Sequence, residues 1–127
     1  MAILRSHHIA IATPNLQRLV DFYTNILQFP VVGHLGEHIT FVDIGGTRLE
    51  LIEKPEATQA QEEGRKGPIH IAFEVDDVES TYNDLVARGV AFHIAPRTPL
   101  EGVGVAFFTD PDGNVLELFR STLPDLK

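Results

Sequence analysis

Two histidines and two glutamates recur at matched places in the two halves of this 127-residue chain. His8 opens the apolar stretch HIAIA and His70 opens HIAFE, while Glu50 and Glu117 each stand between two leucines in the triplet LEL. Imidazole nitrogens and carboxylate oxygens are ordinary ligands of divalent first-row metals. Together the four side chains would form a neutral N2O2 site for Zn, Ni, Co, Mn or Fe, with positions left for water or substrate.

The face of each strand that carries the histidine follows from alternation, because successive side chains on a strand point to opposite sides. His8 shares its side with Ala10 and Ala12, which leave room in front of the imidazole, and His70 shares its side with Ala72. His7 should point the other way, as a hydrogen-bonding residue at the start of the strand. We therefore expect His8→Ala to abolish metal binding and His7→Ala to spare it.

Each glutamate should point away from the leucines that flank it. A buried carboxylate costs several kcal/mol unless it is paired or bound to a cation. A structural role is the alternative, since a lone strand histidine is usually a hydrogen-bonding residue and a lone strand glutamate usually lies at a solvated edge. The recurrence of the same residue types in both halves favours metal binding.

The elements that would position these ligands form a repeat. HIAIATPNLQRLVDFY and HIAFEVDDVESTYNDL each combine a short apolar strand, polar punctuation and a helical pattern, and a run of strand-like segments follows each of them. The repeat predicts a single domain, residues 1–127, made of two modules at about 1–54 and 68–121 with a polar connector at 55–67. With four strands and one helix in each module, the predicted class is α+β, with two curved mixed sheets around a central metal cavity.

Helix boundaries are marked by capping residues. Thr13 or Asn15 can cap the first helix, and Asp76 or Asp77 can cap the second. Gly89 is placed to end the second helix in the left-handed conformation.

Composition argues against several classes of function. The net charge is −8 and the pI is near 5.1, with scattered Lys and Arg, which argues against a nucleic-acid partner. The chain has no cysteine, so thiolate metal sites and cysteine nucleophiles are excluded. No run approaches the ~20 apolar residues of a transmembrane helix, and no secretion signal is recognisable. We expect a cytoplasmic protein with a small-molecule substrate and no membrane partner.

Four stretches of this sequence resemble the vicinal oxygen chelate superfamily, which includes glyoxalase I, methylmalonyl-CoA epimerase, extradiol dioxygenases, fosfomycin-resistance enzymes and bleomycin-binding proteins. The stretches are HHIAIATPNLQRLVDFYTNILQFPVV, GTRLELIE, GPIHIAFEVDDVESTYNDLVARGV and FFTDPDGNVLELF. The resemblance implies paired βαβββ modules around a metal, with His8, Glu50, His70 and Glu117 at the ligand positions. It also implies a homodimer.

The complete His/Glu/His/Glu set looks like that of glyoxalase I, a lyase that isomerises a hemithioacetal by proton transfer through a metal-stabilised enediolate. By this resemblance Glu117 is the catalytic base and Glu50 its partner, and the substrate is a small α-hydroxycarbonyl or thiol adduct. Glutathione-using glyoxalases typically carry arginine and asparagine where this chain has Ala12 and Lys54. The resemblance therefore does not extend to glutathione as the thiol.

Other functions in the superfamily stay open. An Fe(II) enzyme of the extradiol-dioxygenase type would need only His8, His70 and Glu117, an epimerase-like isomerase would use the same metal site, and a resistance-type protein would bind a ligand without chemistry. Phe41, His93 and Arg97 are candidate substrate-binding residues, the last two beside a predicted loop, APRTPLEGVG, that could close over the site.

Overall fold

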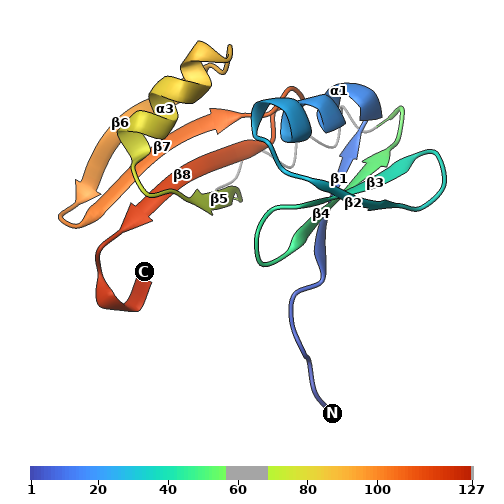
Figure 1. The fold of residues 1–127 in the computed structure, drawn as a ribbon, viewed down its shortest axis with the longest axis horizontal. Coiled ribbons are helices and arrows are strands. Elements are labelled where there is room, and N and C mark those ends of the chain that lie inside the picture. Colours follow the sequence, from blue (N-terminus) through green and yellow to red (C-terminus); the bar gives the residue numbers. More distant parts are fainter. Residues whose placement is uncertain (57–68, 127) are drawn as a thin grey trace. The chain divides into compact units, whose positions relative to one another are not determined.

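The computed structural model describes residues 1–56 and 69–126, which fall into two compact units (Figure 1). The N-terminal unit lies within residues 1–60 and the C-terminal unit within residues 61–127. Each unit has its own four-stranded sheet and its own helical segment. Most of the predicted connector, residues 57–67, lies outside the described residues.

The N-terminal unit contains a mixed sheet in the order β1-β4-β3-β2, in which β1 and β4 are parallel and the other neighbours are antiparallel. Its strands are β1 (His8–Thr13), β2 (Val31–His34), β3 (Ile39–Asp43) and β4 (Arg48–Glu53). The helix α1 (Leu16–Asp21) continues into one π-helical turn, η1 (Phe22–Ile26), and α1 contacts β4.

The C-terminal unit repeats this order, with a sheet β5-β8-β7-β6 in which β5 and β8 are parallel. Its strands are β5 (Ile71–Glu74), β6 (Phe92–Leu100), β7 (Val103–Thr109) and β8 (Val115–Ser121). The helix α3 (Val78–Ala87) lies along β6, β7 and β8, and a short 3-10 helix, η2 (Pro124–Leu126), follows the sheet. The predicted α+β class with two mixed four-stranded sheets is confirmed.

Both cores lie on the helix-facing side of the sheet. Leu49 and Leu51 of β4 and Leu116 and Leu118 of β8 are at most 2% exposed. The leucines of the LEL triplets therefore face the core in both units, and alternation turns the glutamate between them to the other face. We call that other face of each sheet the open face.

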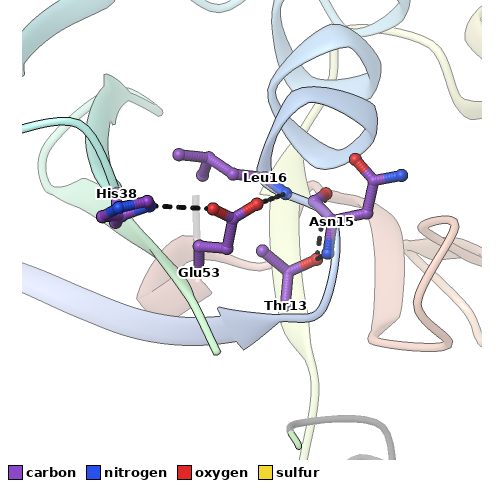
Figure 2. A network of polar contacts seen from close by, with 5 residues as sticks. All are labelled: Thr13, Asn15, Leu16, His38 and Glu53. Carbon is purple, nitrogen blue, oxygen red and sulfur yellow. Dashed lines mark hydrogen bonds and ion pairs between the residues drawn. The ribbon is translucent and has the colours of Figure 1, made fainter. Parts of the chain in front are cut away.

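A polar network joins the start of α1 to the sheet (Figure 2). Asn15 is the N-cap and accepts a hydrogen bond from the backbone N–H of Arg18, and Thr13 Oγ1 accepts one from the N–H of Asn15. Glu53 Oε2 accepts from the N–H of Leu16 at 3.1 Å, while Glu53 Oε1 lies 2.9 Å from His38 Nδ1. The backbone N–H of Leu16 and, after it, His38 lower the pKa of Glu53 below its usual value.

The expected loop between the last strands is wrong. The stretch Ala95–Gly104 is not a loop, because β6 runs to Leu100 and β7 begins at Val103. Only Glu101 and Gly102 form the turn between them, so this segment is built into the sheet. Register shifts along the pairing of β6 and β7 let the strand accommodate its prolines.

Candidate metal centre

The N-terminal unit brings His8 and Glu50 together across two neighbouring strands. In the parallel register of β1 and β4, Glu50 lies opposite Ala10, two residues along from His8 on the same face. His8 Nε2 lies 3.3 Å from Glu50 Oε1. Ala10 follows His8 on this face and carries only a methyl group, so it does not obstruct the imidazole from extending along the strand to the carboxylate.

The C-terminal unit forms the equivalent pair with tighter geometry. His70 immediately precedes β5, and Ala72 of that strand lies opposite Glu117 of β8. His70 Nε2 lies 2.9 Å from Glu117 Oε1. The Glu117 side chain is 8% exposed against 13% for Glu50, so its carboxylate is the better shielded from water.

A phenylalanine flanks each pair in the same way. Phe41 of β3 lies opposite Glu50, and its ring meets the His8 ring edge-on at a centroid separation of 5.6 Å. Phe107 of β7 lies opposite Glu117, and its ring centroid is 5.5 Å from that of His70. Each unit thus presents one histidine, one glutamate and one phenylalanine in the same arrangement on its open face.

His7 does not behave as alternation predicted. Its Nδ1 lies 2.9 Å from Nδ1 of His8, and the two rings pack edge to face with centroids 5.2 Å apart. The expectation fails because β1 begins at His8, so His7 precedes the strand and its side chain is not bound by the strand alternation. His7 therefore contacts the candidate ligand through the ring nitrogen that does not face Glu50.

The three predicted substrate-binding residues lie in different surroundings. Phe41 is part of the N-terminal arrangement, and the His93 ring lies 6.2 Å from that of Phe107, beside the C-terminal pair. Arg97 lies opposite Val105 on β6 and lines a hollow of about 330 Å³ near the start of α3. Arg97 is thus one of the walls of a separate hollow in the C-terminal unit.

Two ligands in a unit do not complete a metal site, because protein zinc sites use three or four protein ligands. Among residues 1–56 and 69–126, no group of three or more His, Cys, Asp or Glu side chains is close enough to hold a metal ion. Each pair nevertheless offers one imidazole nitrogen and one carboxylate on a partly shielded face, a donor set suited to a divalent first-row ion. The residues of each pair therefore fit part of the ligand set of such a metal.

One residue near the N-terminal pair was not predicted from the sequence. Arg48 of β4 lies opposite His8 in the register, and its guanidinium Nη1 donates to the backbone carbonyl of His7 at 3.3 Å. The signal was available, because Arg48 stands two residues before Glu50 and must share its face.

Of the helices in the described ranges, none is long and apolar enough to cross a membrane.

Relatives of this chain include enzymes that differ in reaction. It is 30% identical over 123 residues to a protein named metallothiol transferase FosB from Shouchella clausii, covering 94% of this chain and 82% of that one. It is 36% identical over 96 residues to human mitochondrial methylmalonyl-CoA epimerase, covering 68% of this chain. The chain spans only 54% of the epimerase's length.

Solved structures share the fold over almost the whole chain. UcmS2 superposes with a TM-score of 0.79 at 23% identity, covering 94% of this chain and 100% of that one. TnmS3, an antibiotic binding protein from Streptomyces sp. CB03234, superposes with a TM-score of 0.75 at 26% identity, covering 96% and 99%. The profile of the Glyoxalase/Bleomycin resistance protein/Dioxygenase superfamily matches residues 5–118. The chain belongs to this superfamily.

Proposed function

We propose that the protein is a divalent-metal-dependent lyase or isomerase of the glyoxalase I type, acting on a small α-hydroxycarbonyl or thiol adduct. The observation that carries the proposal is the repeated His/Glu pair, His8 with Glu50 and His70 with Glu117, each on the open face of its sheet. A purely structural ion pair would explain either pair alone. It gives no reason for the same pair, flanked by the same aromatic residue, in both units.

The four side chains would hold one divalent ion, Zn, Ni, Co, Mn or Fe, through two imidazole nitrogens and two carboxylates. When bound, the ion would supply Lewis-acid polarisation of the substrate's vicinal oxygens. His7 would fix the His8 ring through Nδ1 and so leave Nε2 directed at the site, as outer hydrogen bonds to metal-binding histidines generally do.

The chain's own catalytic step is the movement of a proton between adjacent carbons. We assign the base role to Glu117, with Glu50 as its partner. The Glu117 carboxylate, displaced from the ligand set when substrate binds, would take the proton from one carbon and return it to the next. Glu117 is shielded on one side by Phe107 and lies within hydrogen-bond reach of His70, which orients the carboxylate. A positioned general base of this kind contributes about 10²–10⁴-fold to the rate.

The test is metal analysis of the purified protein after supplementation with Ni, Zn, Mn and Fe, followed by a screen for isomerisation of hemithioacetals formed with several thiols. We expect about one ion per chain, and turnover with a thiol other than glutathione. Binding by wild-type protein but not by His8→Ala or His70→Ala would show that both units contribute. Absence of metal under all four conditions would overturn the proposal.

An epimerase-like isomerase is the second candidate, favoured by the 36% identity to human methylmalonyl-CoA epimerase. The required chemistry is the same, since a carboxylate base removes and restores a proton beside a carbonyl. Racemisation of a 2-methyl-branched acyl thioester, without hemithioacetal turnover, would select this candidate. An Fe(II) dioxygenase would instead consume oxygen and tolerate Glu50→Ala.

We further propose that the protein is a cytoplasmic homodimer that takes a small molecule as its substrate. Size-exclusion chromatography with light scattering tests the dimer. Mixing His8→Ala with His70→Ala protein tests whether one site draws on two chains. Restored metal binding in the mixture would show that it does, while two inactive populations would place each site within one chain.

A further inference from the structure

A second concave feature lies in the N-terminal unit and is separate from the hollow lined by Arg97. It is a hollow of about 220 Å³ at the end of the sheet where β4 begins, and it is lined by Arg5, Ser6, Asp43, Gly46, Thr47 and Arg48. The hollow is smaller than the ~300–1,000 Å³ of pockets that enclose a drug-sized ligand. It is therefore sized for one polar end of a molecule and not for a whole substrate.

The hollow carries two positive charges from Arg5 and Arg48. Within the ranges that the structure describes, neither guanidinium has a carboxylate oxygen within 4.0 Å. Asp43 lies opposite Arg48 in the register of β3 and β4, but its Oδ1 accepts from the backbone N–H of Gly45 at 2.8 Å. With one carboxylate against two guanidinium groups, the lining retains a net positive charge at neutral pH.

Hydroxyl groups complete the lining. Ser6 Oγ and Thr47 Oγ1 lie 2.9 Å apart and hydrogen-bond to each other across the hollow's edge, so one of the two has a hydrogen to donate elsewhere. Guanidinium groups and hydroxyls are the donors that bind carboxylate and phosphate oxygens. The set of side chains thus matches an oxyanion.

Arg48 connects the lining of the hollow to the strands that carry the candidate metal ligands. Arg48 lies directly opposite His8 and stands two residues before Glu50, on the same face of β4. Arg48 Nη1 also donates to the carbonyl of His7, which holds the guanidinium beside the start of β1. Arg48 therefore belongs both to the lining of the hollow and to the face of β4 that carries Glu50.

We propose that this hollow binds the anionic group, a carboxylate or a phosphate, of the substrate whose reacting end reaches His8 and Glu50. The inference rests on the proposed function for the identity of the reacting end, but the anion site itself does not require a metal. It defines the substrate class as an acid or phosphorylated compound with its charged group adjoining the reacting carbonyl.

Backbone amide NMR of the whole protein tests the site, with inorganic phosphate and succinate as separate probes at about 10 mM ionic strength, where charge screening is weak. We expect saturable shifts at Gly46, Thr47 and Arg48. Arg48→Gln should weaken the binding about tenfold or more, because a charge-assisted hydrogen bond is lost. Arg18→Gln, on α1 of the same unit, removes the same charge elsewhere and should change the affinity less than twofold.

The two probes separate the possible sources of the anion, since tighter binding of phosphate or of succinate identifies the group preferred. Shifts that chloride reproduces equally, or that Arg18→Gln reduces as much as Arg48→Gln, would overturn the inference. Metal affinity of Arg18→Gln, measured in parallel, should equal that of wild type. Phosphate binding without metal binding would refute the proposed function alone, and metal binding without shifts at residues 46–48 would refute the anion site alone.

Discussion

Each unit places the same His/Glu pair on the open face of its sheet, yet the surroundings of the two pairs differ. In the C-terminal unit, His70 and Glu117 are 2.9 Å apart and the carboxylate is nearly buried. In the N-terminal unit the separation is 3.3 Å, the carboxylate is more exposed, and a second histidine, His7, contacts the ligand ring. Shielding from water suits Glu117, the proposed base, which must hold and transfer a proton. The hydrogen bond with His7 suits His8, a candidate ligand whose ring must keep one orientation.

The helices differ in a related way. α3 is a ten-residue α-helix that is capped by Asp77 and is followed by Gly89 at φ +91°, the left-handed conformation that glycine adopts at low cost. α1 is shorter, passes into a π-helical turn, and is followed by Gln28 at φ +66°. The N-terminal unit therefore carries local strain that its partner lacks, at the helix end.

The largest expected effect tests whether the shielded carboxylate is the base. Glu117→Gln keeps the shape of the side chain but removes its ability to accept a proton, so proton exchange at the substrate carbon should fall about 10²–10⁴-fold. Deuterium incorporation followed by NMR measures it. Glu74→Gln, an exposed change in the same unit, is the control. If Glu50→Gln lowers proton exchange more than Glu117→Gln does, Glu50 and not Glu117 is the base.

The next effect concerns the histidine that only one unit has. Strand alternation alone predicts that His7→Ala spares metal binding. Because His7 contacts the His8 ring, we expect instead that His7→Ala lowers metal affinity about 10–100-fold, as loss of an outer hydrogen bond does. Titration with Zn and Ni by calorimetry measures it. Ile69 is the matched position before His70, and Ile69→Ala should leave the affinity unchanged. Equal affinities for wild type and His7→Ala would make the contact incidental.

A smaller effect is expected at the helix ends. Gln28→Gly should raise the free energy of unfolding by about 0.5–1 kcal/mol, because glycine relieves the left-handed strain but adds unfolded-state entropy. The reverse change, Gly89→Gln, should lower it by about 1 kcal/mol, since a Cβ there meets no atom within 4 Å and only the backbone is strained. Urea denaturation compares them. Changes of the same sign at both positions would contradict this account.

The smallest effect is expected at Glu53, whose carboxylate is partly exposed. The pKa of Glu53 is lowered from 4.5 by the backbone N–H of Leu16 and by His38, so the folded state favours the charged form. Its stabilisation is present above pH 4.5 and is lost as the pH falls through the lowered value. Glu53→Gln should therefore destabilise the protein at about pH 6 and matter progressively less towards about pH 3.

Thermal unfolding across this pH range measures the difference between wild type and Glu53→Gln. Glu37→Gln, an exposed change beside His38, supplies the control and should show no such trend. A difference that stays constant with pH would mean that the hydrogen bonds of Glu53 do not depend on its charge.

Several features followed from local sequence rules. The LEL triplets placed leucines in the core and glutamates on the open face because side-chain alternation holds inside a paired strand. Asn15 and Asp77 cap their helices as predicted, since a short polar side chain can reach the free N–H groups of the first turn. Local rules failed where an element ends or is extended: His7 lies just outside β1, and β6 continues through Pro96 and Pro99.

The sequence by itself determined the repeat, the fold class and the residue types of the candidate ligands, because periodicity and matched spacing are properties of the chain alone. Only the tertiary structure decided which of these residues touch. The parallel register of β1 with β4, and of β5 with β8, brings each histidine to its glutamate across 42 and 47 residues respectively. The same register places Arg48 opposite His8. The contact between His7 and His8 depends instead on where β1 begins, because His7 lies just before the strand. Neither contact follows from spacing along the chain.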